Sequence, residues 1–210
     1  GQESMTNSPH YLNYRKEKNI SEEKLQDTML IDGLIDSYNN YHMGVTAENV
    51  SEKYQITRND QDKFAINSQN KSIKAIKENK FKDEIVPVQL KDQKIFNKDE
   101  YPRSDASLEK LANLKTVFKK NGTVTAGNSS GLNDGAAAVT LMNLKTADKR
   151  KLIPIAKIVS WAQCGVDPKL MGTGPISASN LALKKAGWNI SDLNLVESNE
   201  AFAAQSIAVI

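Results

Sequence analysis

The residues best placed to do chemistry lie where a predicted buried strand runs directly into a predicted helix. Residues 193–197 are typical of a strand, a helix is expected from Glu200 onward, and Asn199 lies at the junction. In open α/β sheets, ligands bind at the carboxyl ends of strands, and a helix N-terminus offers unpaired N–H groups there. Asn199 could orient a water molecule or a carbonyl group at that point. Asn is also a preferred N-cap residue, and the spacing alone favours this simpler role.

A second candidate is the segment from Gly122 to Gly135, which is rich in Gly, Ser, Thr and Asn. Such a backbone lets a ligand approach closely. It is not a Walker phosphate-binding loop, because no Gly-Lys-Ser/Thr sequence ends it and no helix is expected to follow. A tight loop chosen for packing explains the composition equally well.

His42 and Cys164 are the other groups considered for acid–base or nucleophilic chemistry. His42 is one of two histidines, and a lone histidine is more often structural than catalytic. Cys164 has no charged residue or histidine beside it in sequence to lower the pKa of its thiol, so we do not expect it to be a nucleophile. A single cysteine also excludes a disulfide or a Cys-based zinc site within the chain.

The composition is that of a globular protein. The chain has 210 residues, of which 39% are hydrophobic and 25% charged, with a net charge of +3. No apolar stretch approaches the roughly 20 residues needed to cross a membrane. The charge is too small and too interspersed to indicate nucleic-acid binding. Charged residues are concentrated in residues 1–120, which indicates a solvated, mostly helical first part and a more buried second part.

In the first part, the spacing predicts three helices and one strand. Thr46 is expected to cap a short helix, and Thr57 with Asp60 resembles a capping box that opens a helix to about Lys80. Ser107 is expected to cap another short helix. Residues 84–88 are typical of an edge strand. The predicted core residues of the long helix are Phe64, Ile66, Ile73 and Ile76.

The second part alternates between strands and helices, which predicts an α/β layer architecture. Strands are expected at residues 136–142, 155–162 and 193–197, with a charged connection at 148–151 and a turn at 172–175. A helix is expected at 177–186 with Gly187 as its stop, followed by a half-turn capped by Ser191. The chain ends on apolar residues without a helix stop signal, so we expect a piece of a longer protein.

Taken in order, these segments resemble the thiolase family, closest to its biosynthetic acetyl-CoA acetyltransferases. No single segment is specific, but the ordered set covers essentially the whole chain and favours the functional interpretations of Asn199, His42 and the Gly/Ser-rich loop. The segments that carry the resemblance are Gly1-Gln2-Glu3-Ser4-Met5, Asp32-Gly33-Leu34, Tyr41-His42-Met43-Gly44 with Thr46-Ala47-Glu48-Asn49, Thr57-Arg58 with Asp60-Gln61-Asp62, residues 84–88, residues 123–135, residues 158–162, residues 171–175 and Asn199-Glu200-Ala201-Phe202.

The resemblance implies a five-layered αβαβα fold of two similar halves with an inserted loop domain, here incomplete at both ends. Residues 1–132 would form the loop domain that covers the substrate and binds coenzyme A. Residues 133–152 would end the N-terminal half, and residues 153–210 would begin the C-terminal half.

The family is an acyltransferase family of lipid metabolism, and its reaction is a reversible Claisen condensation. Two acetyl-CoA molecules give acetoacetyl-CoA and CoA through an acetyl-cysteine intermediate. The family's nucleophilic Cys, its Gly-His-Pro histidine and its second Cys have no counterpart in this chain, so the isolated chain is expected to be inactive. The resemblance implies no metal and no cofactor besides the coenzyme A thioester that serves as substrate.

The resemblance also transfers site residues, one position at a time. Asn199 corresponds to a catalytic Asn that holds a water in an oxyanion hole, and His42 corresponds to a residue beside the acyl thioester. Arg103 corresponds to a residue near the nucleotide, whereas Lys110 replaces an expected serine contact. The remaining expected substrate-binding residues are Leu34, Met43, Leu114, Phe118, Ala126, Gly127, Ser130, Leu132, Ala201 and Phe202.

Two other functions stay open. One is a degradative 3-ketoacyl-CoA thiolase acting on longer chains, and the other is a non-catalytic relative that binds CoA or lipid. A ketoacyl synthase is disfavoured, because that relative uses two histidines and the segment around His42 does not match it. The family implies a homodimer or homotetramer that acts on acetyl-CoA and acetoacetyl-CoA in the cytoplasm or an organelle matrix, without nucleic acid or membrane.

Overall fold

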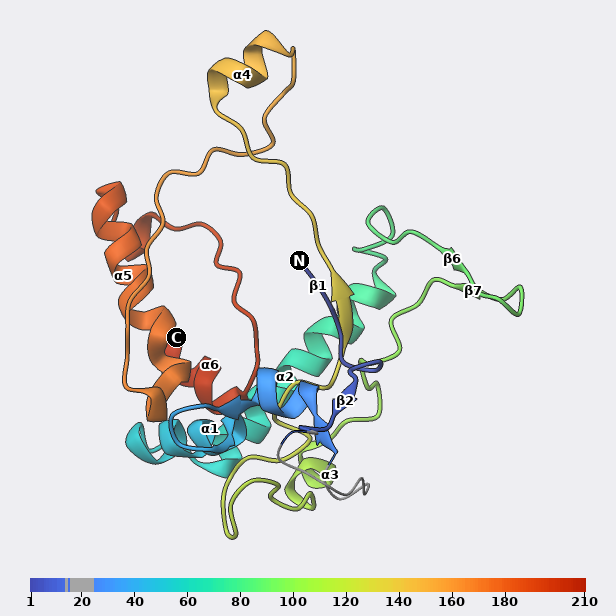
Figure 1. Ribbon diagram of the computed structural model, residues 1–210, viewed down its shortest axis with the longest axis vertical. Coiled ribbons are helices and arrows are strands. Elements are labelled where there is room, and N and C mark those ends of the chain that lie inside the picture. Colours follow the sequence, from blue (N-terminus) through green and yellow to red (C-terminus); the bar gives the residue numbers. More distant parts are fainter. Residues whose placement is uncertain (14, 16–24) are drawn as a thin grey trace.

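The computed structural model describes residues 1–13, 15 and 25–210 (Figure 1). The helices are α1 (Met43–Lys53), α2 (Arg58–Lys77), α3 (Leu108–Ala112), α4 (Leu144–Lys149), α5 (Gly174–Ala186) and α6 (Ala203–Val209). Shorter helical turns are η2 (Met29–Leu34), η3 (Pro168–Thr173) and η4 (Ile190–Asp192).

The strands of the described residues pair only in antiparallel twos: β1 with β8, β2 with β3, β4 with β5 and β6 with β7. Their bounds are β1 (Gln2–Ser4), β2 (His10–Tyr11), β3 (Gln26–Asp27), β4 (Ile35–Asp36), β5 (Tyr41–His42), β6 (Val88–Gln89), β7 (Ile95–Phe96) and β8 (Asp134–Ala136).

The core lies where α1 packs against α6 and η3, and α2 also packs against α6. Val50 of α1 and Ala203 and Ala204 of α6 are buried there. Small residues let these elements approach closely: a Cβ on Gly172 would lie only 2.8 Å from the Cγ of Gln205. The packing therefore joins helices that are more than 100 residues apart in sequence.

The first-part helices form as predicted, with differences at their ends. The capping box of Thr57 and Asp60 is confirmed, because each side chain accepts a hydrogen bond from the other residue's backbone N–H. The expected cap at Thr46 is wrong: α1 begins at Met43, its N-cap is His42, and Thr46 lies inside the helix. Helix α2 ends at Lys77 rather than near Lys80, and Ser107 caps α3 as expected.

The predicted apolar core of α2 is wrong. Phe64, Ile66 and Ile73 are only half-buried and Ile76 is exposed, whereas Gln61 and Asp62 are buried. The reason is that α2 faces the molecule through hydrogen-bonding side chains, whereas its last turn projects beyond the packed region (Figure 1).

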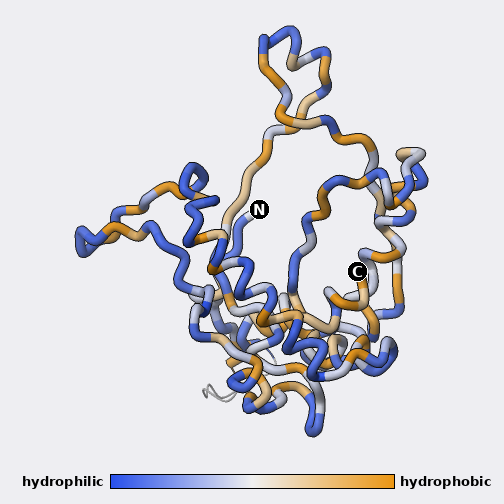
Figure 2. The backbone as a smooth tube through the Cα atoms, turned by 180° about the vertical axis from the view of Figure 1, so that it is seen from behind, coloured by the Kyte–Doolittle hydropathy of each residue, from blue (hydrophilic) through white to orange (hydrophobic). Residues whose placement is uncertain are grey.

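The predicted strands of the second part are wrong except at Ala136, which ends β8 and pairs with Gln2. Residues 137–143, 152–167 and 193–198 form no strands and are mostly exposed, and of residues 84–88 only Val88 pairs. Figure 1 shows residues 137–143, 152–167 and 193–198 as extended arms that lead to and from α4 and α5. Figure 2 shows apolar residues along these arms. A strand needs a hydrogen-bonded neighbour, and none of the described residues offers one.

The connections also differ in detail. Residues 172–175, expected as a turn, end η3 and begin α5 at Gly174, and the expected charged connection lies partly in α4. Gly187 stops α5 as predicted, with a left-handed φ of 71° that favours glycine. The half-turn η4 is present, but its N-cap is Asn189 rather than Ser191.

Candidate functional site

A buried carboxylate anchors the start of the Gly/Ser-rich loop to α1. Glu48 is 4% exposed, and its two oxygens accept hydrogen bonds from the backbone N–H groups of Thr123 and Val124, each at 2.8 Å, and from the Thr123 hydroxyl at 2.9 Å. Burying a carboxylate is costly unless it is hydrogen-bonded, so this contact defines the loop's position. A Cβ on Gly122 would lie 2.2 Å from a Glu48 oxygen, so the approach requires glycine.

A second anchor joins the middle of the loop to α2. Asn128 is 3% exposed, and its amide donates to the Asp62 carboxylate and to the Thr123 carbonyl, both at 3.1 Å. Its side-chain oxygen accepts from the Thr125 N–H at 2.8 Å. Asp62 in turn forms an ion pair with Arg58 at 2.8 Å. The loop is therefore held by both helices through buried polar contacts.

The anchored loop then pairs with the segment that follows Asn199. The Ser130 N–H donates to the Ala201 carbonyl at 2.9 Å, and the Ala203 N–H donates to the Asn128 carbonyl at 2.9 Å. Residues about 70 positions apart in sequence thus lie side by side. The capping role for Asn199 is wrong, because α6 begins at Ala203; Asn199 is exposed in the extended chain before it.

An aromatic cluster lies beside this junction. The His42 ring stacks on Phe118 with centroids 4.6 Å apart, and Phe118 meets Phe202 edge-on at 6.2 Å. The packing requires Gly44, because a Cβ there would lie 2.3 Å from the Phe118 ring. Three of the predicted site residues are therefore in one cluster: they come from the end of β5, the 116–118 segment and the residue before α6.

His42 is held as a neutral imidazole. Its Nδ1 accepts a hydrogen bond from the Gly44 N–H at 2.9 Å, which assigns the ring proton to Nε2. Partial burial lowers the pKa of His42 below its usual value. The ring can therefore donate a hydrogen bond from Nε2 near neutral pH.

Helix α3 covers the other side of the loop. The Arg58 guanidinium donates to the Leu111 carbonyl and, at 3.2 Å, to the Leu114 carbonyl, which ties the end of α3 to α2. A Cβ on Gly127 would lie 2.5 Å from a Leu111 methyl and 2.6 Å from a Leu114 methyl. Gly127 therefore lets these leucines lie on the loop, with Ala126 exposed beside them.

The remaining predicted residues are more loosely placed. Leu34 and Met43 are half-buried; Leu34 precedes Ile35, which pairs with His42. Arg103 is exposed and its N–H donates to Gln69, and Leu132 is 64% exposed. Across the described residues, Arg103 and Leu132 form no hydrogen bond or ring contact with the aromatic cluster.

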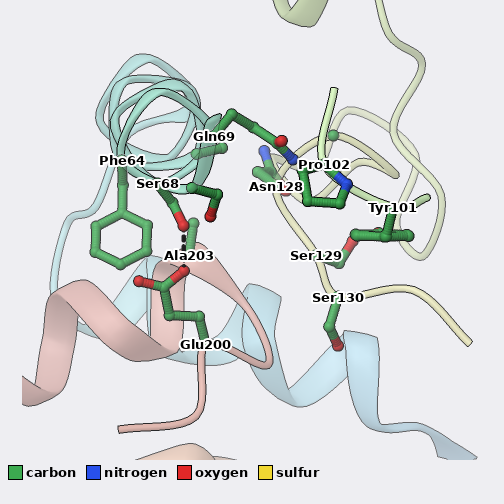
Figure 3. Close-up of a pocket in the computed structure, with 13 residues that line it drawn as sticks. Phe64, Ser68, Gln69, Tyr101, Pro102, Asn128, Ser129, Ser130, Glu200 and Ala203 are labelled. Carbon is green, nitrogen blue, oxygen red and sulfur yellow. Dashed lines mark hydrogen bonds between the residues drawn. The ribbon is translucent and has the colours of Figure 1, made fainter. Parts of the chain in front are cut away.

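Lys110, the predicted departure at the nucleotide end, forms an ion pair with Asp105 at 2.7 Å on the surface. A cleft of about 220 Å³ lies between α2, the loop and the segment after Asn199 (Figure 3). In the part of the chain that the structure describes, no three His, Cys, Asp or Glu residues are grouped so that they could hold a metal ion.

The residues that hold the site together were not predicted from the sequence. No sequence pattern predicts that Glu48 and Asp62 are buried. Asn128 is predicted only as one member of the polar loop at residues 122–135. Their partners lie 66 to 76 residues away, so no local spacing reveals them. A weak signal is their position within short segments that the family resemblance already singles out.

Two family models match the chain: the thiolase N-terminal domain over residues 1–145 and the thiolase C-terminal domain over residues 152–210. The chain therefore belongs to the thiolase family, and the resemblance inferred from its ordered segments is confirmed. It is 55% identical over its whole length to an acetyl-CoA acetyltransferase of Paracoccus denitrificans, of which it covers 54%.

Solved structures agree with this fold. The chain superposes on an acetyl-CoA acetyltransferase of Bacillus anthracis with a TM-score of 0.92 and 45% identity, covering all of this chain and 54% of that one. A human mitochondrial 3-ketoacyl-CoA thiolase in complex with CoA gives a TM-score of 0.90 and 40% identity, with 100% and 53% covered. The chain has the thiolase fold and spans about half the length of these relatives.

Proposed function

We propose that this chain supplies the coenzyme A-binding and oxyanion-stabilising part of an acetyl-CoA acetyltransferase. The observation that carries the proposal is the pairing of the 125–130 loop with residues 201–203, beside the His42–Phe118–Phe202 cluster. The relatives from Paracoccus denitrificans and Bacillus anthracis bear the name of that activity. Residues 1–132 serve as the loop domain, residues 133–152 end the first half and residues 153–210 begin the second.

In the proposed reaction, a cysteine nucleophile outside this chain carries an acetyl group. A second cysteine outside this chain takes the α-proton of a second acetyl-CoA, and the resulting enolate attacks the acetyl carbonyl carbon. A C–C bond forms, the bond from that carbon to the nucleophilic cysteine breaks, the thiolate leaves, and acetoacetyl-CoA is released. Asn199 holds a water molecule that donates a hydrogen bond to the developing negative oxygen. Neutral His42 donates from Nε2 beside the thioester.

The substrate is proposed to lie along the 126–132 loop. Phe202 and Ala201 line the reacting acyl group, Met43 and Phe118 the pantetheine, and Arg103 the phosphates. Leu34, Leu114, Ala126, Gly127, Ser130 and Leu132 complete the pocket. Coenzyme A enters as the substrate's carrier group, and the mechanism calls for no metal or further cofactor.

A second candidate function is a 3-ketoacyl-CoA thiolase that cleaves longer chains. The similarity to the human mitochondrial 3-ketoacyl-CoA thiolase favours it. Activity against acyl-CoA substrates of increasing length distinguishes the two, because a longer chain needs a deeper pocket beyond Phe202.

The proposed assembly is a homodimer or homotetramer, and the proposed compartment is the cytoplasm or an organelle matrix, where CoA thioesters are used. No helix among the described residues is both long and apolar enough to cross a bilayer.

The test uses a chimera in which this chain replaces the matching half of the Paracoccus denitrificans relative. We expect the chimera to cleave acetoacetyl-CoA with CoA, and the isolated chain not to do so, because its only cysteine is Cys164. Asn199→Ala should lower kcat by about 100-fold and change CoA affinity little. Asn194→Ala, in the same open segment, is the matched control. An unchanged kcat in Asn199→Ala, or thiolysis by the isolated chain, would refute the proposal.

A further inference from the structure

The segment that carries Asn199 is attached to the molecule only on its C-terminal side. Residues 194–199 make no hydrogen bond to any described residue, whereas Glu200, Ala201 and Ala203 each make one. Two of these contacts are the backbone pairings with the loop. The third comes from a side chain, and it attaches the residue directly after Asn199.

That side chain is Ser68 of α2. Its hydroxyl donates to a Glu200 carboxylate oxygen at 2.5 Å, and Figure 3 shows this contact crossing from α2 to the segment before α6. Hydrogen bonds to a charged acceptor are about twice as strong as those between neutral groups. Ser68 lies in the middle of a 20-residue helix whose start is held by a capping box. The Ser68 hydroxyl is therefore held by a long, well-capped helix.

We propose that Ser68 is a positioning residue for the condensation reaction: by holding Glu200, it sets the direction of the neighbouring Asn199 side chain. This inference rests on the oxyanion role proposed for Asn199. The backbone pairings at Ala201 and Ala203 locate the segment, but they begin one residue after Glu200. The Ser68 contact adds an attachment at Glu200 itself, next to Asn199, because it joins the Glu200 side chain directly to α2.

Loss of the Ser68–Glu200 hydrogen bond should lower the turnover number kcat rather than the affinity for substrate. An oxyanion contact acts mainly on the transition state, so misdirecting Asn199 lowers kcat and leaves KM nearly unchanged. A displacement of about 1 Å at such a group can cost about 100-fold in rate. A Ser68 that served stability alone would instead lower the melting temperature and leave kcat per folded molecule intact.

The experiment compares Ser68→Ala, Ser68→Thr and Ser72→Ala. Alanine removes the hydroxyl from a helix that tolerates it well, threonine retains the hydroxyl, and Ser72 lines the same cleft one turn further on. In the chimera, Ser68→Ala should lower kcat by about tenfold with KM for acetoacetyl-CoA and the melting temperature unchanged. Ser68→Thr and Ser72→Ala should retain kcat within about twofold of the unmodified chimera.

Amide hydrogen exchange on the 210-residue chain gives a second readout that needs no activity. Exchange of the Ser130 and Ala203 N–H groups, the two donors of the backbone pairing, should be faster in Ser68→Ala than in Ser68→Thr or Ser72→Ala. Unchanged exchange together with unchanged kcat in Ser68→Ala overturns the inference, as does an equal kcat loss in Ser72→Ala. If exchange rises in Ser68→Ala while Asn199→Ala leaves kcat intact, the proposed function fails and the attachment by Ser68 stands.

Discussion

The Glu48 carboxylate is buried, and none of its described hydrogen-bond partners is a charged group. Its oxygens are matched instead by the N–H groups and hydroxyl of Thr123 and Val124. A carboxylate is suited to this position because it accepts several hydrogen bonds and donates none. Its neighbour Glu52 lies one helical turn further on and forms only a surface ion pair with Lys119 at 3.3 Å.

We expect Glu48→Gln to destabilise the chain by about 2 kcal/mol, because the amide would turn N–H groups toward buried N–H donors. Glu52→Gln should cost less than about 0.5 kcal/mol, since exposed ion pairs contribute little. Urea unfolding of the chain and both variants measures the difference. Equal effects of the two substitutions would contradict the anchoring role of Glu48.

His42 should make stability depend on pH. Its pKa in the folded chain lies below the unfolded value, so protons bind preferentially to the unfolded chain once the pH falls below about 6.5. Protonation would also occupy Nδ1, which accepts the Gly44 hydrogen bond. The contribution of His42 to stability is complete above that pH. It declines as the pH falls toward the pKa of His42 in the folded chain, which is the lower of the two values.

Thermal unfolding between pH 7.5 and 5.5, a range spanning about one unit on either side of the histidine value, checks this expectation. His42→Gln should flatten the decline, because it removes the imidazole whose pKa is lowered. If the melting temperature fell equally with pH in the unmodified chain and in His42→Gln, groups other than His42 would cause the decline.

At the scale of elements, the site depends on how closely α1 approaches the 116–118 segment and α6. Gly44 in the first turn of α1 is what permits the Phe118 ring to lie against the helix and between His42 and Phe202. The aromatic cluster therefore depends on a residue without a side chain. Gly174, in the first turn of α5, has open space around its Cα and offers a matched comparison.

Gly44→Ala should destabilise the chain by about 1–3 kcal/mol, because the added methyl group displaces the Phe118 ring. In the chimera it should also raise KM for acetoacetyl-CoA, since Phe118 is proposed to line the pantetheine. Gly174→Ala should be neutral or slightly stabilising, because alanine is the better helix former. Tolerance of Gly44→Ala equal to that of Gly174→Ala would refute the packing argument.

For the whole molecule, the balance of buried and exposed apolar residues is unusual. Ile153, Ile155 and Val139 are almost fully exposed on the arms that carry α4 and α5. Monomeric soluble proteins rarely expose large contiguous apolar surfaces. The arms are therefore surfaces that favour association in the isolated chain.

We expect the purified 210-residue chain to bind a hydrophobic dye and to self-associate at micromolar concentration. Ile155→Lys should reduce both effects, and Gln163→Lys, which adds the same charge at an exposed polar position, should reduce them less. Dye fluorescence and light scattering measure them. A monodisperse monomer without dye binding would contradict the expectation.

Features set by contacts within a few residues were predictable from the sequence. The Thr57–Asp60 capping box, the Ser107 cap and the Gly187 stop each need only a side chain and a backbone within one helical turn. The ordered segments also identified the thiolase family, since many weak local matches in one order are jointly specific. Strand predictions failed at residues 155–162, because apolar alternation is local whereas pairing requires a partner strand.

The sequence alone was enough to identify the family and three helix ends: the Thr57–Asp60 capping box, the Ser107 cap and the Gly187 stop. Only the tertiary structure decided that Glu48 and Asp62 are buried, that Ser130 pairs with Ala201, and that Ser68 reaches Glu200. These contacts join residues far apart in the chain, and each depends on how several helices pack at once. The physical reason is that a cap is satisfied within its own helical turn, whereas a buried carboxylate must find its donors wherever the fold brings them.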